Sequence, residues 1–274
     1  MEGIHLLKDL LRQKDWMAKV DLKDAYFTVP IHKQDRDFLK FAFKNKIYRF
    51  KCLPFGLACA PWVFTKTLKP VAAQLRQLGV RLIVYIDDIL ILAETPDLAR
   101  DHVIGLIYLL ENLGFIVSSQ KCVLEPTQKI DFLGFLVDSV SRELRLPADK
   151  IKKIRADLRK MLSDNSFSAR KLTQMLGKLN AATRAIPLAQ LFYRNLQRAL
   201  ASALGKSGED YSSLLRFSED EREELQRWID HLSSWNRKTM LSRKPTLTIE
   251  SDASRTGWGA TCEEVRTGGH WSEE

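Results

Sequence analysis

The chain has 274 residues, of which 45% are hydrophobic and 28% charged, and its net charge is +9. This composition excludes a disordered or low-complexity chain, because it provides enough apolar surface for a buried core. No apolar run reaches the roughly 18 residues of a membrane span, and charges interrupt the N-terminal MEGIHLLKDLLRQKD, unlike a signal peptide. The four cysteines form no CxxC pair, which argues against a zinc site or disulfide framework. We therefore expect an intracellular protein, cytoplasmic or nuclear, with no membrane partner.

The first half of the chain alternates predicted strands and helices. The predicted strands are residues 17–22, 37–43, 46–53, the two arms of 81–92, 114–119 and 130–137. The predicted helices are residues 61–78, which follow a proline and end at Gly79, and 96–113, which end at Gly114. Without the hairpin at 37–53, the order is β-α-β-β-α-β. This is the ferredoxin-like split βαβ arrangement, an antiparallel sheet backed by two helices, and the fold class is α+β.

The second half is predicted to be helical and strongly basic. Residues 142–206 carry 15 of the basic residues but only 4 of the acidic ones, which favours a polyanion partner. Charge alone leaves a solvated helix face equally open. Residues 148–162 form an amphipathic helix, and Ser168 is expected to cap a second one.

A linker is predicted at residues 205–210, followed by a helix with a capping box at Ser218 and Glu221. Two strands, at 246–254 and 257–264, are expected to close the chain.

The apolar run 82–92 contains Asp87 and Asp88. In a continuous strand, neighbouring side chains point to opposite faces, so one carboxylate would enter the core unpaired. We therefore expect a hairpin with both residues near its tip. Two carboxylates at one tip repel each other and favour a cation, and their oxygen ligands suit Mg²⁺. On this motif alone, an ordinary solvated hairpin turn remains open.

A third carboxylate, Asp21, ends the strand 17–22, which the split βαβ order places beside this hairpin. Asp21, Asp87 and Asp88 could together hold two metal ions, which would activate a 3′-hydroxyl and stabilise a leaving pyrophosphate. Taken alone, Asp21 is a weak signal, because aspartate is common at strand ends.

Several further segments stand in a fixed order around these carboxylates. They are VDLKDAYF (20–27), LPFGL (53–57) followed by Ala60-Pro61, YIDD (85–88), GF (114–115), KC (121–122) and FLGF (132–135). Their order and spacing resemble the motif set of retroelement reverse transcriptases, over about residues 10–140. The later segments SARKLTQMLGKL and SDASRTGWGA resemble DIRS-type tyrosine-recombinase retrotransposons, in which a ribonuclease H domain follows the polymerase.

The resemblance implies roles for individual residues. Asp21, Asp87 and Asp88 would be the catalytic metal-binding triad for two Mg²⁺ ions, or Mn²⁺. The nucleotide-binding residues would be Asp24 and Ala25 at the triphosphate, Tyr26 as the gate against a 2′-hydroxyl, Phe55 and Gly56 in the turn beside the nucleotide, and Lys121 near the pyrophosphate. Family members with glutamine at the Phe55 position have a polar contact there that this chain lacks. For Tyr26 an ordinary sheet aromatic, and for Lys121 a surface lysine, are the structural alternatives.

The resemblance also implies a primer grip and a duplex-binding surface. The grip would be Phe132, Leu133, Gly134 and Phe135, although an FLGF strand also suits a core. The duplex backbone would contact Lys152, Lys153, Arg159 and Lys160. Asp252 would be the first metal ligand of an incomplete ribonuclease H site.

The expected organisation has three parts: a polymerase palm with partial fingers (1–141), a basic helical thumb or connection region (142–206), and a connection helix with a truncated ribonuclease H-like start (207–274). The expected function is that of an RNA-directed DNA polymerase. It would extend a DNA primer on an RNA or DNA template with deoxynucleoside triphosphates.

Two alternatives remain open. A non-catalytic nucleic-acid-binding remnant is one, because only 20 residues precede Asp21 and further ribonuclease H carboxylates are expected beyond Glu274. A ribonuclease is the other, disfavoured by the single carboxylate Asp252. The sequence carries no signal for the oligomeric state.

Overall fold

The computed structural model describes residues 2–240 and 246–272. Two compact units are present, residues 1–240 and 241–274, and each is described by itself. Both boundaries expected within the polymerase region, after residues 141 and 206, fall inside the first unit, so the three-part division remains a prediction. None of the described helices is both long and apolar enough to cross a membrane. All four cysteines are free.

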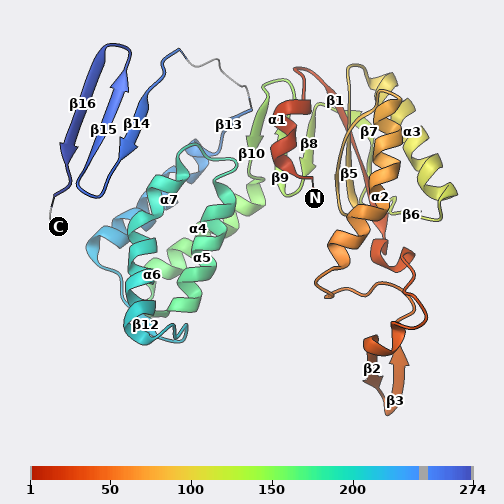
Figure 1. Ribbon diagram of the computed structural model, residues 1–274, viewed down its shortest axis with the longest axis horizontal. Coiled ribbons are helices and arrows are strands. Elements are labelled where there is room, and N and C mark those ends of the chain that lie inside the picture. Colours follow the sequence, from red (N-terminus) through yellow and green to blue (C-terminus); the bar gives the residue numbers. More distant parts are fainter. Residues whose placement is uncertain (1, 241–245, 273–274) are drawn as a thin grey trace. The chain divides into compact units, whose positions relative to one another are not determined.

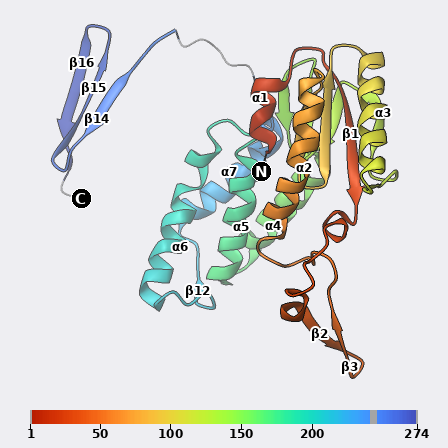
Figure 2. The same ribbon diagram turned by 45° about the vertical axis from the view of Figure 1, so that its right-hand side comes forward.

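The first unit contains an antiparallel sheet in the order β4-β5-β1-β6, with β7 also pairing with β1 (Figure 1). Its strands are β1 (Trp16–Lys23), β4 (Arg81–Tyr85), β5 (Asp88–Ala93), β6 (Ile116–Val117) and β7 (Val123–Thr127). The helices α2 (Ala60–Gln77) and α3 (Pro96–Asn112) pack on one face of this sheet (Figure 2). This is the split βαβ order, so the prediction of a ferredoxin-like palm is confirmed.

The central strands β1, β4 and β5 are buried on both faces, which explains their nearly continuous apolar sequence. In β1, Val20 and Leu22 pack in the cluster that contains α2 and α3, whereas Met17 packs in the other buried cluster. Leu90 of β5 and Ile83 of β4 share that second cluster. Side chains alternate along each strand, so this alternation fixes which face every residue of β1 and β5 occupies.

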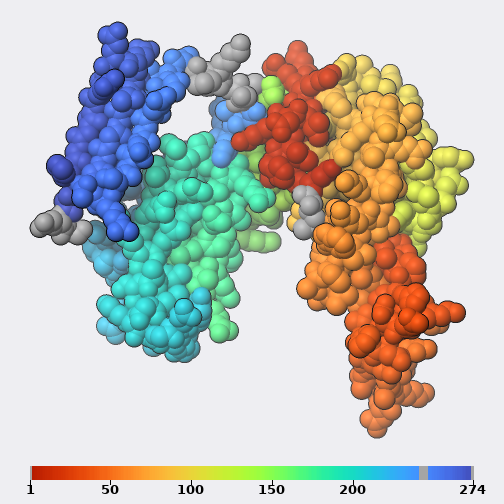
Figure 3. Space-filling model, in the orientation of Figure 1, coloured from red at the N-terminus to blue at the C-terminus, as the bar shows by residue number. Residues whose placement is uncertain are grey.

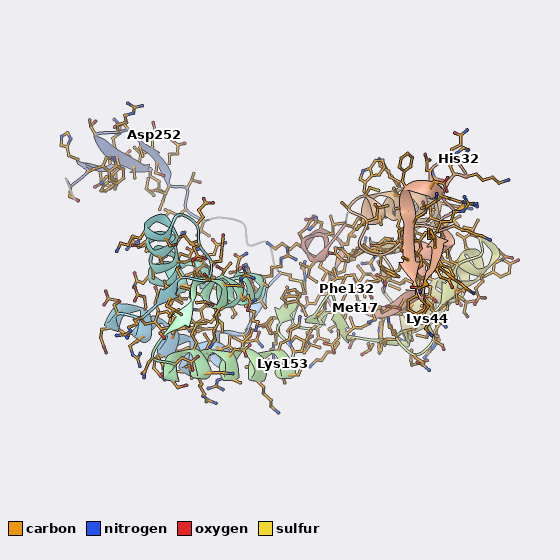
Figure 4. The ribbon with its side chains drawn as sticks, turned by 90° about the horizontal axis from the view of Figure 1, so that it is seen from below. Met17, His32, Lys44, Phe132, Lys153 and Asp252 are labelled. Carbon is orange, nitrogen blue, oxygen red and sulfur yellow. The ribbon has the colours of Figure 1, made fainter. Side chains whose placement is uncertain are left out.

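A second sheet, in the order β13-β10-β9-β8, contributes to the cluster around Met17, which also includes Phe132 (Figure 4). Its strands are β8 (Lys129–Phe132), β9 (Phe135–Asp138), β10 (Glu143–Arg145) and β13 (Lys238–Thr239). We expected one strand over residues 130–137, and this is wrong. Leu133 and Gly134 adopt φ of 49° and 76°, which a two-residue hairpin turn requires.

The basic segment and the residues that follow it, up to Trp235, fold mainly into helices inserted between β10 and β13. They are α4 (Ala148–Ser163), α5 (Ala169–Ala182), α6 (Arg194–Ser207), α7 (Glu219–Trp235) and the 3₁₀ helix η4 (Ala189–Tyr193), with a small β11 (Phe167–Ser168) and β12 (Leu214–Leu215) pair. The Ser168 hydroxyl accepts from the Lys171 N–H, and the Ser218–Glu221 capping box is formed, as expected. The predicted linker at 205–210 instead begins as the end of α6, which Gly208 terminates in the left-handed region.

The N-terminal residues lie against the palm beside α2 (Figure 3). They form η1 (Ile4–Leu6) and α1 (Leu7–Leu10), whose Leu7 is fully buried. The remaining elements of this unit are η2 (Ala25–Thr28), η3 (Arg36–Leu39) and the hairpin β2 (Lys40–Phe43) and β3 (Lys46–Arg49).

The second unit is a three-stranded antiparallel sheet: β14 (Glu250–Ala253), β15 (Gly257–Cys262) and β16 (Val265–His270). Two strands were expected here. The third, VRTGGH, lacks the alternation of apolar and polar residues by which a strand is found.

Candidate active site

Two of the predicted carboxylates face each other across the β1–β5 ladder. Asp21 and Asp88 are direct register partners in this antiparallel pair. The neighbours of Asp21, Val20 and Leu22, point toward α2 and α3, so Asp21 points to the opposite face. Asp88 lies on that same face, because it alternates with Ile89 in the same way. Side chains paired across two strands have Cβ atoms about 5 Å apart, so the two carboxylates are neighbours.

The third carboxylate, Asp87, lies in the two-residue turn between β4 and β5, directly after Ile86. The expected hairpin with Asp87 and Asp88 at its tip is therefore confirmed. Ile86 has a φ of 55°, which is a rare conformation for a β-branched residue. Strain of this kind costs on the order of 1–3 kcal/mol and persists only where the surrounding structure imposes it. Here the paired strands on both sides of the turn impose it.

The electrostatics of this face favour a bound cation. Burial raises the pKa of Asp21, and Asp87 raises it further, while Lys121 opposes the increase. Burial also raises the pKa of Asp88; Lys19 counters this, whereas Asp87 and Asp21 add to it. A neighbouring positive charge stabilises the ionised form of such carboxylates.

One atom in particular lacks a partner: Oδ1 of Asp21 is buried and accepts no hydrogen bond. The nearest cation, Nζ of Lys121, stands 3.8 Å away, which is too long for a hydrogen bond. In the described part of the chain, no three His, Cys, Asp or Glu side chains form a ready-made cage for a metal. The donor set nevertheless fits Mg²⁺, which proteins hold with one or two carboxylates plus water and substrate phosphates.

The predicted gate residue Tyr26 lies beside these carboxylates, in η2 directly after β1. Burial raises the pKa of its hydroxyl, and the nearby Asp87 and Tyr85 raise it further. Its ring centroid is 5.0 Å from that of Phe55 and 5.6 Å from that of Phe64. Tyr26 lies in a 3₁₀ turn rather than in a strand, but its side chain is buried in the cluster that contains α2 and α3, so its role as the gate stays a prediction.

The residues around Tyr26 form the remainder of the predicted nucleotide site. Phe55 is 63% exposed although it contacts Tyr26, so its other side faces solvent. Gly56 has a φ of 87°, and a side chain there would be strained. Asp24 precedes η2 and Ala25 is its first residue, and the first backbone N–H groups of such a turn have no acceptor within it. The triphosphate role of these N–H groups stays a prediction.

Sequence reasoning assigned no role to two residues that contact or act on these carboxylates. Cys122 accepts a hydrogen bond from the backbone N–H of Asp21, with an N–S distance of 3.2 Å. Lys19 is the cation that counteracts the pKa increase at Asp88. Strand alternation could have found Lys19, which is two positions before Asp21. Nothing local could have found the contact of Cys122, which is 101 positions away.

The side chains of α4 that were predicted to contact the duplex are all exposed: Lys152, Lys153, Arg159 and Lys160. They lie along two separate lines on the helix surface. With about 100° per residue, Lys153 and Lys160 fall on one line, and Lys152 and Arg159 on another. Lys153 borders a groove of about 490 Å³ between α4 and α5. The neighbouring Arg155 is not free, because its guanidinium donates to the carbonyl of Ile229 in α7.

Asp252 lies in β14 of the second unit and is exposed; its carboxylate accepts from the N–H of Ala253. Within residues 246–272 no cluster of metal-binding side chains surrounds it. Its ribonuclease H role therefore stays a prediction.

Residues 2–137 match the family "Reverse transcriptase (RNA-dependent DNA polymerase)". Two similar viral polyproteins align over nearly the whole chain. Polyprotein P3 of Commelina yellow mottle virus is 25% identical over 96% of this chain and 13% of its own length. The enzymatic polyprotein of Carnation etched ring virus is 27% identical over 94% of this chain and 37% of its own. The chain thus spans only a minor part of these relatives.

Solved structures show the same fold. The foamy viral protease-reverse transcriptase in complex with an RNA/DNA hybrid superposes with a TM-score of 0.71 at 19% identity, over 99% of this chain and 35% of that one. A complex of the same viral protein with double-stranded DNA has a TM-score of 0.70 at 20% identity, covering 98% of this chain and 54% of that one. The polymerase fold expected from the sequence is therefore confirmed.

Proposed function

We propose, from the match of residues 2–137 to the reverse transcriptase family, that the chain is the RNA-directed DNA polymerase core of a retroelement. The single observation that carries the proposal is the pairing of Asp21 with Asp88, beside Asp87 and Tyr26, inside the matched segment. In this proposal the substrates are an RNA or DNA template, a DNA primer and deoxynucleoside triphosphates.

Asp21, Asp87 and Asp88 would hold two Mg²⁺ ions, or Mn²⁺. Bound divalent cations would activate the primer 3′-hydroxyl and neutralise the charge on the leaving pyrophosphate. The unpartnered Oδ1 of Asp21 is the atom that supports this assignment most directly. Lys121 would keep a proton close to the leaving group, because its exposed ammonium stands beside Asp21.

Tyr26 would select the sugar by its shape. Its ring is held between Phe55 and Phe64, so it cannot turn away from an incoming nucleotide. A ribose placed against the ring would bring its 2′-hydroxyl into contact with carbon atoms that cannot accept a hydrogen bond. Phe55 offers only an apolar surface there, so discrimination at this position would rest on shape.

The nucleic-acid partner is proposed on two grounds. Helix α4 exposes Lys152, Lys153, Arg159 and Lys160, and such cations bind phosphates without regard to sequence. The similar foamy viral structures are complexes with double-stranded DNA and with an RNA/DNA hybrid. The turn Phe132–Phe135 would hold the primer end.

Two finer assignments belong to the same proposal. The DIRS-type subgroup rests on the segments SARKLTQMLGKL and SDASRTGWGA, and a tyrosine-recombinase gene beside the coding sequence would test it. The ribonuclease H-type start rests on Asp252 in the first strand of the three-stranded sheet.

Primer extension on an RNA template with Mg²⁺ tests the main proposal. The wild-type chain should extend the primer, Asp88→Asn should not, and Asp101→Asn, which changes an exposed carboxylate on α3, should behave as wild type. Duplex binding without extension by the wild type would instead identify a nucleic-acid-binding protein without polymerase activity.

A further inference from the structure

The turn at the tip of the β8–β9 hairpin has an unusual backbone. Leu133 and Gly134 both have positive φ, and they separate the paired residues Phe132 and Phe135. Both phenylalanines are buried, so the base of the turn is anchored in the core. For a leucine the left-handed region is unfavourable, and such a conformation persists when neighbouring groups hold it.

The group that holds this turn comes from another element, the first turn of α4. Nζ of Lys150 donates a hydrogen bond of 2.7 Å to the carbonyl of Gly134. The same ammonium lies 5.5 Å from the ring centroid of Phe135, in a cation–π arrangement. A side chain at Gly134 would meet this ammonium, so the fit between the two is close. A hydrogen bond from a charged donor is stronger than a neutral one.

Hydrogen bonds join a residue just before α4 to the residue after α7, so they hold the two ends of the helical segment together. Leu146, just before α4, donates its N–H to Oδ1 of Asn236, and Nδ2 of Asn236 donates back to the Leu146 carbonyl. Asn236 follows the last residue of α7. The position of Lys150 therefore depends on the contact between Leu146, which follows β10, and Asn236, which precedes β13.

We propose that Lys150 is a positioning residue, which holds the Leu133–Gly134 turn from helix α4 and thereby aligns the primer end that this turn binds. The proposal rests on the proposed polymerase function. The Lys150 contact would make the alignment of the primer end depend on the position of α4. A shift of the helices proposed to bind the duplex would then also move the turn.

The test compares Lys150→Met with Lys150→Arg, which keeps the charged donor, and with Lys129→Met as a matched control. Lys129 lies at the other end of the same hairpin, where its ammonium is 3.2 Å from the Asp138 carboxylate. Two quantities are measured in the full chain: amide hydrogen exchange in residues 132–136, and the single-turnover rate of nucleotide addition together with the Kd for primer–template. Lys150→Gln replaces the Met variant if that variant fails to fold.

We expect Lys150→Met to accelerate exchange and to slow nucleotide addition by about tenfold each, with the Kd within about threefold of wild type. Lys150→Arg should restore both, and Lys129→Met should change neither. Unchanged exchange in Lys150→Met would overturn the proposal. A weaker Kd with an unchanged addition rate would also overturn it, since Lys150 would then be a phosphate contact. If the wild type itself adds no nucleotide, the polymerase proposal fails, whereas the exchange comparison still decides whether Lys150 holds the turn.

Discussion

Asp21 and Asp88 pair in register at the end of the β1–β5 ladder, with both carboxylates on the face that points away from α2 and α3. Burial raises the pKa of each, so both carboxylates destabilise the folded chain when they are ionised. The residues that we propose as metal ligands therefore lower the stability of the folded protein when no metal is bound.

We expect Asp88→Asn to abolish primer extension and to raise the melting temperature at pH 7 by about 2–4 °C, or roughly 1 kcal/mol at this chain length. The physical reason is that asparagine removes a charge that the folded state disfavours. Circular dichroism melts of wild type, Asp88→Asn and the control Asp101→Asn measure the change. An Asp88→Asn variant that extends primers at the wild-type rate would contradict the assignment of this residue.

The pH dependence of this difference follows from the direction of the pKa change. A raised pKa in the folded state means that the folded chain binds more protons than the unfolded one between the two pKa values. Wild-type stability therefore falls as the pH rises through that window. The advantage of Asp88→Asn should be full above the window and vanish below about pH 4, near the ordinary aspartate pKa. Equal advantages at pH 7 and at low pH would show that the change acts through packing.

Divalent cations should stabilise the wild type more than a variant that lacks one of the three carboxylates. Added Mg²⁺ should raise the melting temperature of the wild type, since ligand binding to the folded state stabilises it. It should have a smaller effect on Asp21→Asn, which lacks the unpartnered carboxylate oxygen. An equal Mg²⁺ response in both proteins would place the metal elsewhere.

Tyr26→Val should relax discrimination against ribonucleotides. The ring that would meet the 2′-hydroxyl is removed, and a steric contact of this size is worth about tenfold or more in selectivity. The ratio of dNTP to NTP incorporation measures the effect. Tyr26→Phe keeps the ring and its packing against Phe55 and Phe64, so it should keep the ratio. An unchanged ratio in Tyr26→Val would make Tyr26 a purely structural aromatic.

A buried ion pair holds the N-terminal segment to the palm. Asp15 is 1% exposed and accepts two hydrogen bonds from the Arg81 guanidinium, of 2.6 and 2.8 Å. Removing one partner leaves the other charge buried and uncompensated, so Asp15→Ala should cost about 3–5 kcal/mol in urea unfolding. Asp97→Ala breaks an exposed pair with Arg100 and should cost less than about 1 kcal/mol. Similar losses in both variants would contradict this account.

The palm was predictable from the sequence because its signals are local. The short apolar run of β1 predicted a strand, and the cost of burying Asp87 or Asp88 within a continuous strand predicted the hairpin. The turn at Leu133 was not predictable, since a leucine at positive φ contradicts local preference and needs Lys150 to hold it. Contacts of this kind join residues far apart in the chain, as between Asp21 and Cys122, and no local pattern encodes them.

The two lines of basic residues on α4 allow a test of the proposed duplex-binding surface. We expect neutralisation of Lys152, Lys153, Arg159 and Lys160 to weaken primer–template binding without sequence preference. For every phosphate that is no longer neutralised, the slope of log K against log salt should flatten by roughly 0.9. Separate double variants then identify the line that faces the duplex. Lys153→Gln with Lys160→Gln should have the larger effect, because Lys153 borders the groove between α4 and α5.

A charge-matched control distinguishes direct phosphate binding from long-range attraction. Lys8→Gln with Lys129→Gln removes the same charge from α1 and β8, outside the helical segment, and should leave the slope unchanged. A slope that changes equally in all three double variants would mean that only net charge matters. Parallel slopes in the α4 variants and the wild type would place these four residues on a solvated face that the duplex does not touch.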